Sequence, residues 1–238
     1  FSVNYVMLHS NSKLPLHYVI SSLWAGHSGS ILLLLLIKSI LSIIFFNFIY
    51  RDLITNQLLK IDQLSKTCLY LYLIVYANPF MRELPDLPID GNDLNPLLQD
   101  LSMTYHPPIF FLGVSFLYMV WLFTASKILK PIKLFNNIAW WFLTAGIVLG
   151  ARWAYTELGW GGYWFWDPVE NISLMPWLCL TALVHTIKVF EKRSSLATWT
   201  LVLSISSFTL SMCGTFLVRS GILNSVHTFA NDPSRGLY

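Results

Sequence analysis

Charged side chains are scarce in this sequence. Asp, Glu, Lys and Arg make up 11% of the 238 residues, whereas hydrophobic residues make up 55%. A soluble domain usually carries roughly a quarter charged residues, so this chain cannot cover a water-facing surface of normal size. The composition therefore argues against a soluble enzyme, a nucleic-acid binder or a disordered tail, and it predicts a protein with several membrane-spanning helices.

Paired cysteines are also missing. Cys68, Cys179 and Cys213 each stand alone in an apolar stretch, with no CxxC pair among them. This pattern argues against a disulfide framework, a cysteine-type zinc site and a CxxCH motif for covalent haem attachment. The net charge of +3 is small and spread along the chain, so it does not indicate a nucleic-acid partner.

What the sequence does contain is a set of long apolar stretches. A helix needs roughly 20 apolar residues to cross the hydrocarbon core of a bilayer. Six spans are expected, at residues 30–50, 62–80, 108–129, 132–155, 172–190 and 196–218, and the second has the shortest apolar core. Because no internal repeat or low-complexity tract interrupts them, we expect a single all-α integral membrane domain over residues 1–238.

The number of crossings determines which segments share a face. Residues 1–29, the loops at 79–107 and 156–171, and the tail from residue 219 are separated by two spans each, so they should lie together. That face holds five basic and nine acidic residues, and the opposite face holds nine basic and three acidic residues. Basic residues collect on the negative side of a membrane. The sequence therefore places both termini on the outer face, which is periplasmic or faces the intermembrane space.

The outer loop at residues 156–171 reads TELGWGGYWFWDPVEN. An interfacial aromatic belt is the simpler explanation of a tryptophan, and it suits Trp140, Trp141 and Trp199. A belt does not explain aromatic rings that crowd around glycines, which let the backbone turn sharply and a ligand approach closely. Such rings could form a platform for a large planar ligand. The residues concerned are Trp160, Gly161, Gly162, Trp164 and Trp166.

Two carboxylates follow the rings. Asp167 and Glu170 begin the fifth span, where negative charge suits the positive end of the helix dipole. Capping is the preferred explanation for Glu170, and Asp167 is kept as a candidate for ligand contact.

Two histidines flank this Trp-rich loop on the outer face. His106 precedes Pro107 and Pro108, which suit the first turn of the third span, and an imidazole at a helix N-terminus tends to stay neutral, as a metal ligand must. His227 lies nine residues after Val218. Either one alone would be an ordinary capping or loop histidine. As a pair they match bis-histidine ligation of haem, and we favour that interpretation.

Two more ionisable side chains are expected inside the membrane. His185 lies about four turns into the fifth span, where an ionisable residue indicates a functional site. No other histidine lies at a matching depth, so a haem at His185 would take its second ligand from outside this chain or be five-coordinate. Lys38 lies near the middle of the first span. It could snorkel, pair with another subunit, or mark a helix packed against protein, and the sequence leaves all three open.

Four strings of residues carry a family resemblance. They are NSKLPLHYVISSLWAGHSGS, NPFMRELPDLPIDGNDLNPLLQDLSMTYHPP, WAYTELGWGGYWFWDPVENISLMPWL and GTFLVRSGILNSVHTFANDPSRG. The Trp-rich loop alone is shared with CcmC haem exporters and CcsA-type synthases, but PVENISLMPW and NDLNPLLQD are not. From about Ser10 to Tyr238 the chain resembles the N-terminal and central part of the CcmF family of membrane haem lyases.

The resemblance implies roles for these residues. The loop, known in that family as the WWD domain, would hold haem delivered by the chaperone CcmE. His106 and His227 would be the axial ligands of this haem on the outer face. His185 would ligate a second, b-type haem in the membrane, which receives electrons from quinol. Both haems would be bound non-covalently, and the second would be shared with a partner chain.

The resemblance also implies an activity and a set of partners. The chain would be the haem-binding component of an enzyme that joins reduced haem vinyl groups to the thiols of a CxxCH motif in apocytochrome c. The expected partners are a separate C-terminal CcmF subunit, a CcmH-type thiol-handling protein, CcmE, apocytochrome c, quinol and the lipid bilayer. The alternative is a CcmF-derived structural or electron-transfer subunit of a larger respiratory complex without lyase activity.

Two departures from the family pattern accompany the resemblance. Ser28 stands where the family has a glutamate, and Lys38 is not expected in the first span. Full-length family members continue for several more helices, so we expect a split subunit of the kind found in plant and some protist mitochondria. The 20 Ile against 10 Ala are typical of AT-rich genomes, organellar ones included. The expected location is the mitochondrial inner membrane, with a bacterial inner membrane as the alternative.

Overall fold

The computed structural model describes residues 1–82, 84, 85, 87–159 and 161–219, so Trp160 and His227 lie outside the described residues. Six long helices carry the fold. They are α3 (His27–Ile44), α4 (Asn56–Val75), α5 (Ser102–Ala125), α6 (Ile132–Glu157), α7 (Pro168–Arg193) and α8 (Ala197–Arg219). Shorter elements are α1 (Asn4–His9), α2 (Leu16–Ser21), η1 (Ser22–Trp24), η2 (Phe45–Ile49), η3 (Arg51–Leu53) and η4 (Pro96–Leu98). The described part contains no strand element, which confirms the all-α prediction.

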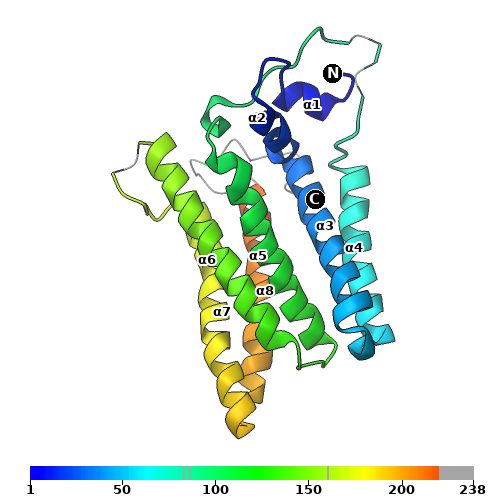
Figure 1. The fold of residues 1–238 in the computed structure, drawn as a ribbon, viewed down its shortest axis with the longest axis vertical. Coiled ribbons are helices and arrows are strands. Elements are labelled where there is room, and N and C mark those ends of the chain that lie inside the picture. The colour runs from blue at the N-terminus through cyan, green and yellow to red at the C-terminus, as the bar shows by residue number, and fades with distance from the viewer. Residues whose placement is uncertain (83, 86, 160, 220–238) are drawn as a thin grey trace.

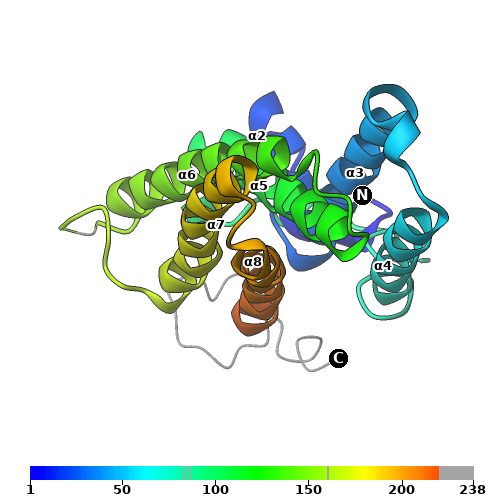
Figure 2. The same ribbon diagram turned by 90° about the horizontal axis from the view of Figure 1, so that it is seen from below.

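The long helices run up and down in one bundle (Figure 1). α3, α5 and α7 begin at the end of the bundle where α1, α2 and residues 76–101 lie, and the connection from α6 to α7 lies at this end too. Viewed from below, α5 lies near the middle, with α3 and α4 on one side and α6 and α7 on the other (Figure 2). We call this shared end the loop end, because it gathers the described residues of the N-terminal segment and of the two loops that the crossing argument groups together.

Five helical segments are long and apolar enough to cross a membrane. They are His27–Ile49, Ser102–Ala125, Ile132–Glu157, Pro168–Arg193 and Ala197–Val218. The expected second span, residues 62–80, is different. Its helix is α4, which starts earlier, ends at Val75 and carries Lys60, Asp62 and Lys66. Hydropathy therefore supports five of the six expected spans, while Figure 1 shows α4 lying beside α3 along the bundle.

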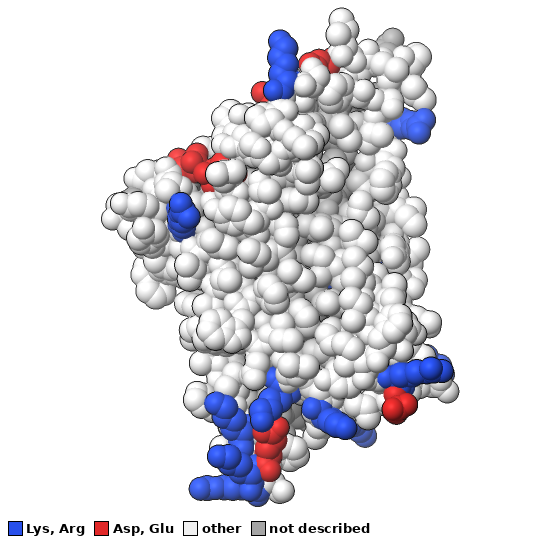
Figure 3. All heavy atoms as spheres, viewed as in Figure 1, with Lys and Arg blue, Asp and Glu red and all other residues white. Residues whose placement is uncertain are grey.

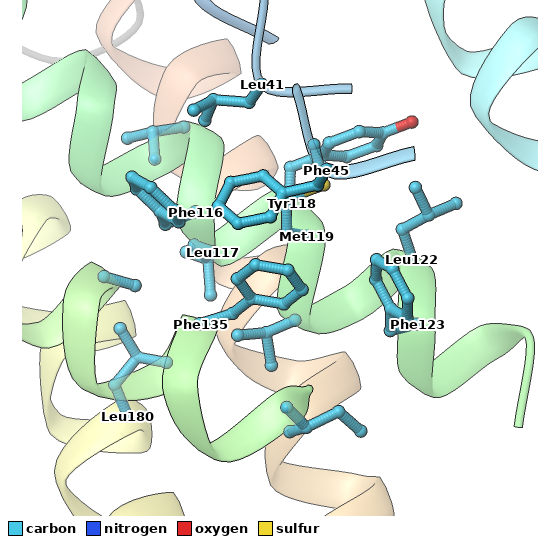
Figure 4. Packing of buried hydrophobic residues seen from close by; sticks show 14 of the residues in the cluster. Leu41, Phe45, Phe116, Leu117, Tyr118, Met119, Leu122, Phe123, Phe135 and Leu180 are labelled. Carbon is cyan, nitrogen blue, oxygen red and sulfur yellow. The ribbon is translucent and has the colours of Figure 1, made fainter. Parts of the chain in front are cut away.

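The hydrophobic core is centred on α5. Leu117, Tyr118 and Phe123 have no exposed surface, and a helix that is apolar all round must be enclosed by other helices. Aromatic rings from three elements meet there (Figure 4). The ring centroid of Phe135 lies 4.8 Å from that of Phe45 and 5.2 Å from that of Phe123. These separations are within the range of favourable aromatic pairs.

The start of α5 differs from the prediction. The helix begins at Ser102, so Pro107 and Pro108 lie in its second turn and not in its first. Pro107 has no N–H to donate to the Met103 carbonyl four residues earlier. The indole Nε1 of Trp24 donates to that carbonyl instead, at 2.8 Å. At Pro107 another segment therefore supplies the missing donor.

Two tryptophans join α6 to α7 inside the bundle. Trp140 Nε1 donates to Thr181 Oγ1 at 2.8 Å, and Trp177 Nε1 donates to Thr144 Oγ1 at 2.7 Å. The two indoles stack with centroids 5.8 Å apart. Trp140 therefore contributes to the packing of α6 against α7.

Charged side chains gather at the two ends of the bundle and leave a wide uncharged band between them (Figure 3). Lys and Arg dominate the end opposite the loop end, whereas the loop end carries both signs. The basic residues of the α5–α6 turn and of the last turns of α7 are Lys127, Lys130, Lys133, Lys188, Lys192 and Arg193.

One group of charges lies inside the bundle. Asp62 of α4 is 5% exposed. It accepts hydrogen bonds from the Tyr118 hydroxyl at 2.9 Å, the Ser42 hydroxyl at 3.2 Å and the Lys66 amine at 2.7 Å. These contacts join α4 to α3 and α5.

Lys38 completes this group. Its side chain is 4% exposed, and its amine contacts the Ser65 hydroxyl at 3.3 Å and lies 3.7 Å from the centroid of the Tyr118 ring. Of the three explanations left open by the sequence, packing against protein is therefore the correct one. We call Lys38, Ser42, Asp62, Ser65, Lys66 and Tyr118 the buried ion cluster.

Candidate functional site

An apolar cavity of about 300 Å³ lies at the loop end of the bundle. Its walls come from the starts of α3, α5 and α7 and from the last turns of α6 and α8. Pockets for small molecules usually measure about 300–1,000 Å³ and are mainly apolar, with a few placed polar groups. The large apolar side chains in the wall include Trp24, Ile31, Phe110, Trp153 and Ile172.

Aromatic donors hold the segment before α5 against this cavity. Trp153 Nε1 donates to the Leu97 carbonyl at 3.1 Å, and the Tyr18 hydroxyl donates to the Gln99 carbonyl at 2.8 Å. Burial raises the pKa of the Tyr18 phenol, and the negative charges of Asp100 and Glu157 raise it further. Because the phenol stays protonated, it remains a donor for this bond.

His106 is the polar group best placed to bind a metal. It lines the cavity, and its Nδ1 lies 2.9 Å from the carbonyl oxygen of Gly146 on α6. Because a carbonyl can only accept, this bond assigns the proton to Nδ1, and in the neutral ring the lone pair is then on Nε2. Metal-bound histidines commonly donate their second nitrogen to a carbonyl in this way.

Two glycines on α6 make this geometry possible. A Cβ at Gly150 would lie 2.8 Å from Cε1 of His106, and a Cβ at Gly146 would lie 3.0 Å from Cα of Phe110. Small residues four apart let two membrane helices approach closely. The pair therefore brings α6 near enough for its carbonyl to orient the imidazole.

The described aromatic and glycine residues predicted for the site, Gly161, Gly162, Trp164 and Trp166, do not line this cavity. Trp166 is 70% exposed, and its indole lies 6.2 Å from that of Trp164, nearly perpendicular to it. The φ angle of Trp166 is +57°, a left-handed conformation that costs a non-glycine residue about 1–3 kcal/mol. A Cβ at Gly161 or Gly162 would meet open space. These four predicted site residues thus share one exposed loop, apart from the wall that holds His106.

Asp167 and Glu170 form a capping box at the start of α7. Asp167 Oδ2 accepts from the Val169 N–H at 3.0 Å, and Glu170 Oε2 accepts from the N–H groups of Asp167 and Phe165, both at 3.1 Å. This reciprocal arrangement satisfies backbone donors at the helix start. The capping role expected for Glu170 is confirmed, and contact of Asp167 with haem stays a prediction.

His185 lies on a different surface from His106. Its side chain is exposed on α7, on the same helical stripe as Met175, Leu178 and Ala182, which are exposed as well. The structure therefore does not bring His185 into the cavity. His227, the expected second ligand on the outer face, lies outside the described residues.

Sequence reasoning missed His27 as a site residue. It is the first residue of α3, it lines the same cavity as His106, and its Nε2 lies 2.7 Å from the Tyr72 hydroxyl on α4. The crossing pattern could have identified His27, because it places the starts of α3 and α5 at the same end of the bundle. Two histidines at those starts can face one cavity.

The described residues contain no group of three or more His, Cys, Asp or Glu side chains that could hold a metal ion. A single prepared imidazole in an apolar wall suits a metal that brings its own equatorial ligands, as iron does in a porphyrin. The fold and the cavity together define a class: an α-helical multi-span membrane protein with an apolar, histidine-containing cavity beside an exposed aromatic loop.

Comparisons with known proteins identify the family. A family model described as Cytochrome C assembly protein matches residues 24–223, so the chain belongs to that family. The chain is 46% identical to the cytochrome c-type biogenesis proteins CcmF of Pseudomonas aeruginosa and Escherichia coli, over its whole length and 38% of theirs. It is 42% identical to the biogenesis protein NrfE of Haemophilus influenzae, with 99% of this chain and 39% of NrfE covered.

A solved structure agrees with this assignment. The fold matches a structure named Cytochrome c Heme Lyase CcmF with a TM-score of 0.74 and 30% identity, covering 93% of this chain and 36% of that one. The chain thus corresponds to the N-terminal part of CcmF, as the resemblance implied, and spans less than two fifths of the length of these relatives.

Proposed function

We propose that the chain is the haem-binding component of a CcmF-type cytochrome c haem lyase. The observation that carries the proposal is His106, an imidazole whose Nδ1 is engaged by Gly146 in an apolar cavity of about 300 Å³. The residues fit a porphyrin, since the wall is apolar, one imidazole presents a metal-binding nitrogen, and Gly150 keeps the space around the ring open. When bound, haem supplies the iron and the vinyl groups that join the thiols of apocytochrome c.

His227 is the proposed second axial ligand of this non-covalent haem. Val218, near the end of α8, lines the cavity. Nine residues separate Val218 from His227 in sequence, a length that can reach about 30 Å when extended. The chain therefore has ample length to return an imidazole to the cavity.

His185 is the proposed ligand of a second, b-type haem within the membrane. An ionisable side chain exposed on a membrane helix is unfavourable unless it meets a partner. The exposed stripe of α7 therefore supports a ligand supplied from outside the described residues, and the proposed source is the C-terminal part of CcmF, as a separate subunit. In this proposal quinol reduces the membrane haem.

The proposed topology has six crossings with the loop end outside. α3 and α5 begin at the same end of the bundle (Figure 1), so α4 must return the chain across the membrane if both of its neighbours span it. The buried ion cluster lets α4 do so despite its charges. The basic end then faces the negative side, in the mitochondrial inner membrane or, alternatively, a bacterial inner membrane.

The outer partners would meet the Trp-rich loop. Its exposed rings, Trp166 and Phe165 among them, offer a surface for haem carried by CcmE. Apocytochrome c and a CcmH-type thiol-handling protein would approach the same face. The thiols for the reaction come from these partners, since this chain has no CxxC pair.

Covalent haem formation tests the proposal. In cells that express an apocytochrome c reporter with the complete set of partners, depletion of this chain should reduce the haem-stained reporter to background, and re-expression should restore it. A reporter that matures equally well without the chain would contradict the lyase assignment.

The runner-up is a CcmF-derived structural or electron-transfer subunit of a respiratory complex. It predicts that cytochrome c maturation does not depend on His106 or His227. The engagement of His106 Nδ1 by Gly146 favours a haem-binding role over a purely structural one, because a relic histidine has no need of a defined metal-binding nitrogen. Dependence of maturation on His106 then separates the lyase from an electron-transfer subunit.

Gly150→Ala should disturb haem ligation and leave the bundle intact. The new methyl group would lie 2.8 Å from the imidazole, so the ring must move away from its carbonyl partner. Haem retention should fall roughly 10- to 100-fold, as for other losses of support to a metal ligand, with a shifted Soret band. The control Ala145→Leu enlarges an exposed position of the same helix and should change neither quantity.

Trp164→Ala and Trp166→Ala should weaken haem retention without disturbing membrane insertion. Trp166 is 70% exposed, so its removal costs the fold little packing. Haem content per protein and membrane-inserted protein should be measured together. Loss of the whole protein in proportion to the haem would show that these rings support the fold and would contradict a haem-holding role.

A further inference from the structure

The described lining of the cavity offers very few side chains that can be positively charged opposite the acidic edge of a ligand. None of its described lining residues is Asp, Glu, Lys or Arg, and His27 and His106 are the only titratable side chains in that set. Haem carries two propionate carboxylates, and an unpaired carboxylate is costly to remove from water. With His106 assigned to the iron, His27 is the remaining side chain of the described lining that can carry a positive charge opposite a carboxylate.

His27 is held in place from the side of α4. Its Nε2 lies 2.7 Å from the Tyr72 hydroxyl, and the two rings meet edge to face with centroids 6.0 Å apart. Whichever group donates, this bond fixes the orientation of the imidazole before any ligand arrives. A side chain whose rotamer is fixed by a neighbouring hydrogen bond holds a ligand in a better defined position than a side chain that can change rotamer.

We infer that His27, positioned by Tyr72, binds a carboxylate of the planar ligand whose metal is held by His106. A nearby carboxylate favours the N–H donor and protonated states of an imidazole, so ligand and residue stabilise each other. The inference rests on the proposed haem function and adds to it a direction for the ligand, with its acidic edge toward α3.

A titration with two ligands tests this assignment. The detergent-solubilised full chain, freed of haem, is titrated with haem and with haem dimethyl ester, which lacks both carboxylates. The wild type should bind haem at least about tenfold more tightly than the ester, the difference expected for a hydrogen bond to a charged group. His27→Phe should lose that advantage and bind the ester as the wild type does.

Two further variants test whether Tyr72 positions His27 and whether the effect is specific to that histidine. Tyr72→Phe should lower haem affinity by a smaller factor and leave ester affinity unchanged, because the imidazole stays but loses its support. His17→Phe replaces a histidine that does not line the cavity and should have no effect.

Three results would overturn the assignment. Equal weakening of haem and ester by His27→Phe would mean a packing role. If His27→Phe converted a six-coordinate low-spin haem spectrum to a five-coordinate one, His27 would be an axial ligand of the iron. A wild-type chain that binds neither ligand would refute the proposed haem function itself, and this inference with it.

Discussion

Replacing His106 by alanine should remove haem from the outer site. The imidazole lines the cavity, and its Nδ1 donates to the backbone carbonyl of Gly146 at 2.9 Å. Without it the cavity keeps its apolar walls but loses the metal ligand. We expect haem retained through purification to fall by more than about tenfold, a larger loss than that for a supporting residue, and covalent cytochrome c to fall with it.

This variant has two controls, which are rescue by added imidazole and the replacement of another histidine at the loop end. Added imidazole should restore part of the haem signal in His106→Ala, because a free ligand can enter the vacated space. His17→Ala removes a histidine of the loop end that does not line the cavity, and it should retain wild-type haem. Full cytochrome c maturation in both His106→Ala and His227→Ala would rule out the lyase assignment.

Replacing Asp62 by leucine should be the most destabilising single change in the bundle. Asp62 is 5% exposed and accepts hydrogen bonds from Tyr118, Ser42 and Lys66. Its loss leaves the Lys66 amine without its ion-pair partner, which lies 2.7 Å away. Breaking a buried ion pair in this way costs about 3–5 kcal/mol. The free energy of unfolding in mixed micelles should fall by that amount, and less protein should accumulate in membranes.

A double variant distinguishes charge from packing. Removal of both partners of the ion pair in Lys66→Met with Asp62→Leu should recover much of the loss, since replacement of a whole buried ion pair by apolar residues is often neutral. Glu191→Ala provides the matched control, because its pair with Lys133 joins side chains that are 44% and 47% exposed. An exposed pair of this kind is worth less than about 1 kcal/mol. A double variant as unstable as the single one would contradict the electrostatic account.

The helical fold was largely predictable because bilayer-spanning segments must be apolar and of nearly fixed length. Five of the expected spans coincide with helices, although α5 begins at Ser102 and not at Pro108. That error has a tertiary cause. The donor that lets α5 pass through Pro107 is the indole of Trp24, a contact that no local rule can see.

The least predictable parts of the molecule are its intramembrane polar contacts. The sequence left three explanations for Lys38, and only the packing of α3 against Ser65 of α4 and Tyr118 of α5 decides among them. For Trp140, similarly, the sequence indicates a belt residue and does not reveal its hydrogen bond to Thr181. In both cases the partner lies tens of residues away along the chain.

For the candidate site, the sequence identified one histidine but not the contacts that orient it or the second histidine beside it. His106 was identified from its neighbours Pro107 and Pro108, yet its preparation for metal binding comes from Gly146 and Gly150 on the next helix. His27 was passed over because nothing local distinguishes it. It becomes a candidate only when α3 and α5 place it on the same cavity as His106.

The most direct measurement is a pyridine haemochrome spectrum of this protein, purified mildly from its native membrane with the chains that accompany it. The account predicts a b-type spectrum from haem that acidified acetone extracts, together with a CcmF-like C-terminal partner. A preparation without haem that instead carries respiratory-complex subunits would contradict it, and would leave the cavity histidines without the role assigned to them.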